Sequence, residues 1–578
     1  MTSKDRLMTS PITRPRDIES LQVAASWPGA DQATLVVLAA RLAAAGADAD
    51  GYRFFQRQAD AQPGEALPLA LAGYFQARLG QDSGPALAKL DQAAKAGLGL
   101  PQYLRGLALA GLPASRERAR QAVTDLEFVL TVRDQFPLGM IRAAYCGLAA
   151  AYAALGQDDQ AAEAATRSGL GSLPWDSRLL VSSWWRTSDD GFRFTTPKIF
   201  RPDADVRVAQ GYDFADFSFI TTSDGVIAID AGSSEHRVSH ALADLGLPPG
   251  TPVSHLIITH AHLDHVGGIA ALRGPGTQVI TQAGFPAEQS RQQHHSALPF
   301  RSYVGNVPST PPDITPDRLI GEPTSLTIGG TELVLYPTRG GETPDALMIY
   351  LPASGLLFTG DVMMPYLGSP FAAEGSPEGL LETLRFIRDL SPRALIQGHT
   401  PLTETFTIEV IPGLEAALTE LHHRTLDDIS AGRTLPDTLD RCYLPETLRV
   451  HPRAVVPYLV IRDRFAARLH HQRTGYWHQD GHGLQVFTAA EQAAALGLLA
   501  DGREEPFTTA ATTLTSQGDH ALALHIVQAG LACHPASTAL AQLRQTLLHR
   551  LIDADQQLVP FRFAIYAELA GAEIGPVT

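Results

Sequence analysis

The residues best suited to chemistry lie in one short segment, THAHLDHVGG, at residues 259–268. It holds four side chains of metal-binding type, which are His260, His262, Asp264 and His265. Imidazole nitrogens and carboxylate oxygens are the ligands that zinc and other borderline divalent ions prefer. The apolar run at residues 256–259 is typical of a buried strand, so a tight turn at its end would aim these side chains at one point. The segment therefore predicts a metal site rather than four unrelated surface or core residues.

The HxHxDH pattern resembles the signature of the metallo-β-lactamase superfamily. The resemblance implies an α/β fold, an αββα sandwich with a two-metal site at the edge of its sheets. Three further apolar runs carry a polar residue at their exit, as parallel or buried strands should. They are GVIAIDAG with Asp230, GLLFTGDV with Asp361 and ALIQGHT with His399. By the same resemblance, Asp230 supports the site from behind the ligands, Asp361 bridges both metals and His399 is the last ligand.

One position departs from the common pattern of that superfamily. Most members carry a histidine in a turn between HxHxDH and the bridging aspartate, but the matching stretch at residues 339–352 has Glu342 there. A carboxylate can replace an imidazole on zinc, and Asp345 is the other candidate ligand. With this glutamate the chain resembles the alkyl sulfatase branch, which hydrolyses sulfate esters. Residues 421–452 resemble the start of that branch's helical dimerisation region, which implies a homodimer.

The resemblance implies two zinc ions, although other divalent transition metals suit the same residue types. The ligands of the first ion would be His260, His262 and Glu342. Those of the second would be Asp264, His265 and His399, with Asp361 between the two ions. A metal-bound hydroxide would be the nucleophile, because metal binding lowers the pKa of water from 15.7 towards ~7. Asp264 would also orient this nucleophile, so it is a candidate catalytic residue.

Three residues outside the ligand set are candidates for contact with the substrate. Arg301 is the candidate clamp for an anionic ester, because a guanidinium binds a tetrahedral oxyanion with two hydrogen bonds; a surface arginine is the alternative. Tyr366 is the nearest proton donor after Asp361, where the sulfatase branch carries a histidine, and is the candidate general acid. Tyr476 is a second candidate in the pocket. Packing in the core or wall is the alternative for both tyrosines.

Three functions are compatible with these residues. The leading hypothesis is a dinuclear zinc hydrolase that acts on alkyl sulfate esters. The alternative is that the same metal site cleaves another bond, in a lactone, β-lactam, thioester, sulfamate or phosphodiester, because the sulfatase histidine after Asp361 is missing. A binding protein without activity is disfavoured by the complete ligand set.

The composition limits partners and location. A net charge of −16 over 578 residues argues against a nucleic-acid groove, which needs clustered Lys and Arg. The three cysteines lie far apart and predict neither a disulfide framework nor a zinc–cysteine site. The first residues lack the apolar core of a secretory signal, and there is no uncharged apolar run of about 18 residues. We therefore expect a cytoplasmic protein without a membrane span.

The sequence pattern changes twice along the chain. Residues 1–190 are rich in Ala and Leu at helical spacing and predict tetratricopeptide-like hairpins, as at residues 69–97. Residues 191–412 carry short β runs, Gly/Pro turns and the metal motifs, and are the predicted catalytic domain. Residues 413–578 return to helical periods and are predicted to be a helical dimerisation-type domain. We interpret the histidines on its helices, such as His470, as surface or dimer-contact residues.

Overall fold

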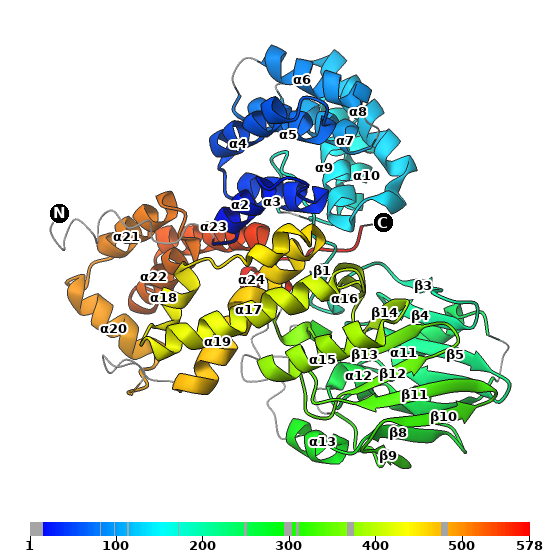
Figure 1. Cartoon of the computed structure of the whole chain (residues 1–578). Helices are drawn as coiled ribbons and strands as arrows, with labels where there is room; N and C mark the ends of the chain where they lie inside the picture. The colour runs from blue at the N-terminus through cyan, green and yellow to red at the C-terminus, as the bar shows by residue number, and fades with distance from the viewer. Residues whose placement is uncertain are drawn as a thin grey trace.

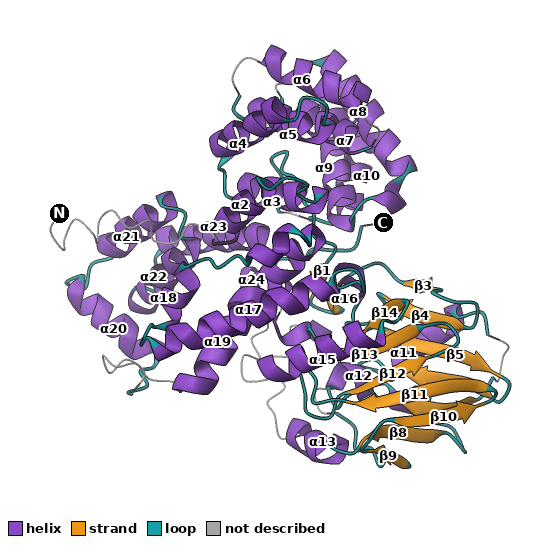
Figure 2. Cartoon of the chain, viewed as in Figure 1, coloured by secondary structure: helices purple, strands orange, loops and turns teal. Residues whose placement is uncertain are grey.

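The computed structural model describes residues 16–80, 83–96, 99–112, 115–171, 173–247, 251–293, 303–307, 311–366, 375–475 and 484–577. The chain forms a sandwich of two β-sheets with helices on both outer faces, and two helical regions pack beside it (Figure 1). Figure 2 shows that the longer strands gather in the sandwich and that helices joined by loops make up most of the other described parts. The predicted fold class, an αββα sandwich flanked by all-helical regions, is confirmed.

The larger sheet has seven strands in the order β3-β4-β5-β6-β7-β8-β9. Their bounds are Lys198–Phe200, Val206–Gln210, Phe217–Thr222, Gly225–Ile229, Val253–Ile257, Gln278–Gln282 and Arg318–Ile320. Strands β6 to β9 pair in parallel, and β3 to β6 pair antiparallel. Parallel neighbours end at the same edge of a sheet, so β6 and β7 deliver the residues that follow them to one place.

The smaller sheet has five strands in the order β10-β11-β12-β13-β14. Their bounds are Thr324–Ile328, Thr331–Pro337, Leu347–Leu351, Leu356–Gly360 and Ala394–Gln397. Only β13 and β14 pair in parallel among these five, so they too end side by side. A short ribbon, β1 (Trp185–Thr187) with β2 (Gly191–Arg193), lies before the sandwich in sequence.

The interior of the sandwich is built from β-branched and leucine side chains that alternate along the strands. Ile229 and Ile257 of the larger sheet pack with Leu335, Ile349 and Phe358 of the smaller one, and all are buried. Burial of this apolar surface is the main force that holds the two sheets together. The strand ends that carry the metal motifs are therefore fixed by a rigid core.

Helices cover both outer faces. On the larger sheet lie α11 (Glu235–Asp244) and α13 (Phe285–Gln293). On the smaller sheet lies α15 (Pro377–Leu390), whose apolar residues recur every three or four positions and face the strands. The short helix α16 (Thr400–Thr405) follows β14 after an interval of two residues, with His399 at its N-cap.

The N-terminal region is all helical in its described part. Its α-helices are α2 (Arg16–Ala25), α3 (Gln32–Ala44), α4 (Asp48–Ala61), α5 (Ala66–Arg78), α6 (Ser83–Ala96), α7 (Leu100–Gly111), α8 (Arg116–Thr131), α9 (Leu138–Leu155) and α10 (Asp158–Ser168). The helical hairpin predicted at residues 69–97 is confirmed as α5–α6, and the same pattern at residues 143–169 forms the hairpin α9–α10. Gly156 ends α9 with φ +77°, a left-handed conformation that suits glycine. Among the helices described, α9 alone is long and apolar enough to cross a membrane, and 61% of it is buried inside the molecule.

The C-terminal region is also helical. Its α-helices are α17 (Ile411–Ser430), α18 (Leu435–Asp440), α19 (Val455–Thr474), α20 (Ala489–Leu499), α21 (Glu505–Ser516), α22 (His520–Cys533), α23 (Thr538–Asp555) and α24 (Pro560–Ala570). The interpretation of His470 as a surface or dimer-contact residue is wrong. Only 3% of it is exposed, and a ring nitrogen lies 3.2 Å from the carbonyl of Arg433.

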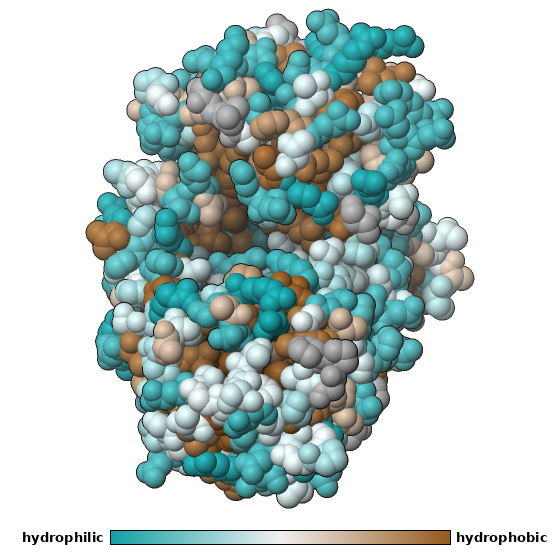
Figure 3. Space-filling model, turned by 90° about the vertical axis from the view of Figure 1, so that its right-hand side faces the viewer, coloured by the Kyte–Doolittle hydropathy of each residue, from teal (hydrophilic) through white to brown (hydrophobic). Residues whose placement is uncertain are grey.

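The two helical regions meet, although the sandwich separates them in sequence. Ile574 exchanges backbone hydrogen bonds with Arg186, and the buried guanidinium of Arg142 donates to the carbonyls of Ser168 and Gly575. Figure 3 shows hydrophobic residues lining a hollow between the upper, helical part of the molecule and the part below it, while hydrophilic residues cover much of the remaining visible face.

Candidate metal centre

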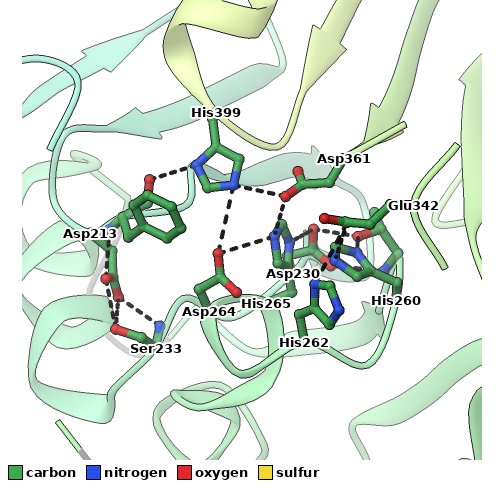
Figure 4. A network of polar contacts seen from close by, with 12 residues as sticks. Asp213, Asp230, Ser233, His260, His262, Asp264, His265, Glu342, Asp361 and His399 are labelled. Carbon is green, nitrogen blue, oxygen red and sulfur yellow. Dashed lines mark hydrogen bonds and ion pairs between the residues drawn. The ribbon is translucent and has the colours of Figure 1, made fainter. Parts of the chain in front are cut away.

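The strand ends bring two groups of metal-binding side chains together (Figure 4). The first group is His260, His262 and Glu342, and the second is Asp264, His265, Asp361 and His399. Within each group the ligand atoms lie within 4.8 Å of one another. These seven residues are the ones that the sequence predicts as ligands. They come from the loop after β7, the short helix α12 (Leu263–Val266), the loop before β12, and the ends of β13 and β14.

In the first group, Glu342 approaches both histidines. Its Oε2 lies 3.1 Å from Nε2 of His260 and 3.6 Å from Nδ1 of His262. Burial, together with the neighbouring histidines, lowers the pKa of His260 well below its ordinary value, so this imidazole is neutral and keeps a lone pair for a cation. Asp345, the other candidate, is buried but does not belong to either group. Burial raises its pKa to about 6.

In the second group, Asp361 lies between two imidazoles. Its Oδ2 is 2.8 Å from Nε2 of His399 and 3.3 Å from Nε2 of His265. Oδ2 of Asp264 is 3.6 Å from the same nitrogen of each histidine. All four side chains are buried. Buried charges are costly unless they are paired or bind a metal. This concentration of buried acids and histidines therefore fits a cation-binding role.

Two further observations fit divalent cations at this place. Oδ1 of Asp361 is buried and has no hydrogen-bond partner in the part of the chain that the structure describes. A cavity of about 10 Å³ is lined by residues of both groups, namely His260, Glu342 and Asp361, among others. This volume suits about one water molecule. The donor set, with nitrogen and oxygen atoms only, is of the kind that zinc and similar ions accept.

Asp230 holds His265 in place from behind. Its carboxylate accepts hydrogen bonds from the backbone N–H and the hydroxyl of Thr259, both at 2.8 Å, and lies 2.8 Å from Nδ1 of His265. When Nδ1 donates to this carboxylate, Nε2 keeps its lone pair and faces Asp361. Asp230 has φ +62°, a strained conformation for a residue other than glycine, and such strain is tolerated where surrounding contacts fix it.

His399 is held by a loop that carries no recognisable motif. Its Nδ1 lies 2.8 Å from the carbonyl oxygen of Phe214. The neighbouring Asp213 accepts a hydrogen bond from Arg237 at 2.9 Å. It also accepts one from the backbone N–H of Ser233 at 2.6 Å (Figure 4). The loop before β5 is thereby tied to the loop after β6. Sequence reasoning missed this support, and the two acids within GYDFADFS were its only signal.

Replacing Asp213 with asparagine is expected to lower the free energy of unfolding by about 3–5 kcal/mol, because it leaves the buried Arg237 without its counter-charge. Burial pushes the pKa of Asp213 up, but the guanidinium groups of Arg237 and Arg193 and the hydrogen bonds from Ser233 outweigh it and hold this pKa below its ordinary value. The stabilisation is thus full above the unfolded-state pKa of about 3.9 and is lost as the pH falls further. Urea unfolding from pH 3 to 7 measures both effects.

The matched control for this change is Asp125→Asn, which removes a buried acid paired with Arg105 in the N-terminal helices. We expect it to cost stability without changing metal content, whereas Asp213→Asn should also weaken metal binding through Phe214 and His399. Equal metal content in both variants would contradict this role for the loop.

Gly398 precedes His399 and leaves no room for a side chain. A Cβ atom there would lie 1.9 Å from Oδ1 of Asp361 and 2.9 Å from Cε1 of His265. Gly398→Ala is therefore expected to displace Asp361 and to lower metal affinity by about tenfold or more. Metal titration against a competing chelator measures this. Gly64→Ala, where a Cβ meets nothing within 4 Å, is the control and should bind metal as the wild type does.

Of the three residues predicted to contact the substrate, the structure describes only one. Arg301 and Tyr476 lie outside the described residues. Tyr366 ends the short helix η3 (Met364–Tyr366), is 1% exposed, and packs against Phe465 with ring centroids 5.8 Å apart. Burial raises its pKa far above the ordinary value, so the hydroxyl stays protonated. It has no hydrogen-bond partner among the described residues.

The chain matches known proteins over the part that carries this site. The family model described as "Metallo-beta-lactamase superfamily" matches residues 211–399. Hydroxyacylglutathione hydrolase of Rhodobacter capsulatus is 31% identical over 240 residues, which cover 41% of this chain and 78% of that protein. The chain belongs to the metallo-beta-lactamase superfamily. The predicted enzyme class, a metal-dependent hydrolase, is confirmed at this level.

Within the superfamily, alkylsulfatases share more of the layout of this chain. "Linear primary-alkylsulfatase" of a Pseudomonas species is 22% identical over 332 residues, or 50% of this chain and 61% of that protein. The solved structure of the stereoselective inverting sec-alkylsulfatase Pisa1 from Pseudomonas sp. has a TM-score of 0.53 and 18% identity, and covers 65% of this chain and 66% of the other. This match shows a shared fold that extends beyond the sandwich. The chain spans less than two thirds of each of these alkylsulfatases.

Proposed function

We propose that the protein is a dinuclear zinc-dependent hydrolase of alkyl sulfate esters. The observation that carries the proposal is Glu342, which joins His260 and His262 where most members of the superfamily have a third histidine. The similarity to alkylsulfatases in sequence and in fold outside the sandwich supports the same substrate class. The first ion would be held by His260, His262 and Glu342, and the second by Asp264, His265 and His399, with Asp361 between them.

The residues around the proposed ions have distinct tasks. Bound zinc would supply Lewis-acid activation of water and of the ester oxygen. Asp264 would orient the attacking water with its second oxygen. Asp230 would accept a hydrogen bond from Nδ1 of His265, and the carbonyl of Phe214 one from Nδ1 of His399. Nε2 of each ring would thereby stay directed at the site.

The substrate itself would be bound by residues outside the ligand set. Arg301 would hold the sulfate group with two hydrogen bonds. Tyr366, protonated at neutral pH, and Tyr476 are the candidate donors to the leaving oxygen.

A substrate panel tests the proposal. Zinc-loaded protein is incubated with dodecyl sulfate and a secondary alkyl sulfate, and released sulfate is measured, with Asp264→Ala as the control. Sulfate release that depends on Asp264 is the expected result. No release from any alkyl sulfate by fully metal-loaded protein would overturn the substrate class, and release that persists in Asp264→Ala would overturn the metal mechanism.

A second candidate is hydrolysis of a thioester by the same site. It is favoured by the similarity to hydroxyacylglutathione hydrolase and by the sequence after Asp361, which lacks the histidine of the sulfatase branch. A hydroxyacylglutathione belongs in the same panel. Thiol release that depends on Asp264, without sulfate release, would decide in its favour.

We also propose that the protein forms a homodimer through its C-terminal helices. The segment around α20 exposes a group of large apolar side chains, which are Leu484, Val486, Phe487, Leu498 and Leu499. Large apolar side chains left exposed near one another in sequence fit a contact surface. Light scattering should give twice the chain mass, and Leu498→Lys with Leu499→Lys should halve it. A monomeric wild type would exclude the dimer.

A further inference from the structure

The loop that carries Glu342 is held from outside the sandwich. The backbone N–H of Gly375 donates to the carbonyl of Glu342 at 2.9 Å, and that of Ser376 donates to the carbonyl of Gly341 at 3.2 Å. Ser376 caps the start of α15, because its hydroxyl accepts from the N–H of Gly379. The position of Glu342 therefore depends on where residues 375 and 376 lie.

The fit around this loop is close. A Cβ on Gly341 would lie 1.9 Å from the carbonyl of Val362, which directly follows Asp361. A Cβ on Gly375 would lie 2.7 Å from the carbonyl of Gly341 and 3.0 Å from the hydroxyl of Tyr366. Gly375 also has φ +84°, which favours glycine. Backbone packed this closely transmits small displacements to Glu342.

A helix of the C-terminal region fixes Gly375 in turn. Arg468 on α19 donates from Nε to the carbonyl of Gly375 at 2.9 Å. Phe465, one turn earlier on the same helix, is fully buried and packs on Tyr366. One residue, Gly375, thus accepts a hydrogen bond from the helical region with its carbonyl and donates one to the carbonyl of Glu342 with its N–H.

We propose that Arg468 is a positioning residue for Glu342, so that helix α19 sets the geometry of the first metal group through Gly375. The inference rests on the metal-binding part of the proposed function and is independent of the bond that is cleaved. It assigns the C-terminal region a task at the metal site that differs from subunit contact. The second group has its own supports, Asp230 and the carbonyl of Phe214, and does not use this contact.

Metal titration with Arg468→Met tests the proposal, because methionine keeps an apolar stem of similar length but cannot donate a hydrogen bond. Zinc binding is measured against a competing chelator, and cobalt(II) spectra report on ligand geometry. We expect affinity for one of the two ions to fall about tenfold, as for other outer supports of metal ligands, with the other ion unchanged. Arg468→Lys, which retains a donor, should restore part of the loss.

The control is Arg473→Ala on the same helix, where an exposed arginine pairs with Glu378; it should bind both ions as the wild type does. A double-mutant cycle separates positioning from general destabilisation. In a Glu342→Gln background, Arg468→Met should cost no further metal affinity, because Arg468 is proposed to act on the metal only through the carboxylate of Glu342, which this variant lacks.

The titrations distinguish failure of the proposed function from failure of the role of Arg468. If the wild type binds no divalent metal, the proposed function fails. If the wild type binds two ions and Arg468→Met binds them equally well, the role of Arg468 fails while the proposed function stands. Equal weakening of both ions, or a further loss in the Glu342→Gln background, would also overturn it. Should Arg468→Met not fold, the same titrations are made with Arg468→Lys: a weaker affinity for one ion is expected, and unchanged affinity for both ions would overturn the proposal.

Discussion

Replacement of Asp361 by asparagine is expected to lower kcat by at least about 10²–10³-fold, the cost of losing one preorganised charge at a reacting centre. Its Oδ2 faces Nε2 of both His265 and His399, and its Oδ1 has no hydrogen-bond partner among the described residues. An amide of the same shape removes the negative charge and turns an N–H₂ donor towards groups that should face a cation. The measurements are kcat with the substrate that the panel identifies and the metal content of the purified variant.

Asp428→Asn on α17 is the matched control, because Asp428 is a buried acid paired with Arg441 and belongs to neither metal group. It should retain both metal content and kcat. A fully metal-loaded, fully active Asp361→Asn variant would show that this aspartate does not lie between two ions.

Removal of metal is expected to have the second large effect. Without cations, Asp264, Asp361 and Glu342 stay close together in a buried site and lose the charge that offsets their desolvation. Zinc at 1,000 times its dissociation constant should therefore raise the free energy of unfolding over the chelated protein by about 4 kcal/mol for each ion that binds. Urea unfolding with zinc and with a chelator measures this difference, and readdition of zinc should restore activity.

A double variant, His260→Ala with His399→Ala, provides the control for that experiment. It removes one imidazole from each group, so its unfolding midpoint should respond little to zinc or chelator. If the wild type unfolds at the same urea concentration with and without zinc, the two groups do not bind metal in the folded state.

The strand-end residues could be predicted from sequence because their signal is local. Each follows a short apolar run, and the parallel pairs β6–β7 and β13–β14 carry these exits to the same edge of the sandwich. Asp230 therefore lies beside the HxHxDH segment, and Asp361 lies beside His399. The helical hairpins were predictable for the same reason, since apolar spacing and turn glycines are readable within about 30 residues.

The supports of the site could not be predicted, because their signal is not local. A backbone carbonyl such as that of Phe214 has no signature in the amino-acid type. The contact of Arg468 with Gly375 joins residues 93 apart, and nothing in either stretch marks the other. The prediction that His470 is exposed was wrong for a related reason. A polar residue on an amphipathic helix reads as exposed until the neighbouring helices are known.

The closing contact of the two helical regions has a consequence for biosynthesis. The buried guanidinium of Arg142, whose pKa burial lowers to about 10, has a hydrogen-bond acceptor, Gly575, that lies 433 residues later in the chain. At a translation rate of about 5–20 residues per second, that acceptor emerges roughly 20–90 s after Arg142 does. During this interval the N-terminal helices can form their hairpins, but a cation destined for the interior must remain hydrated. The contact of Arg142 with Gly575 is therefore expected to form late, and ribosome-bound nascent chains that have not reached residue 575 should be more open to protease around residue 142 than longer ones.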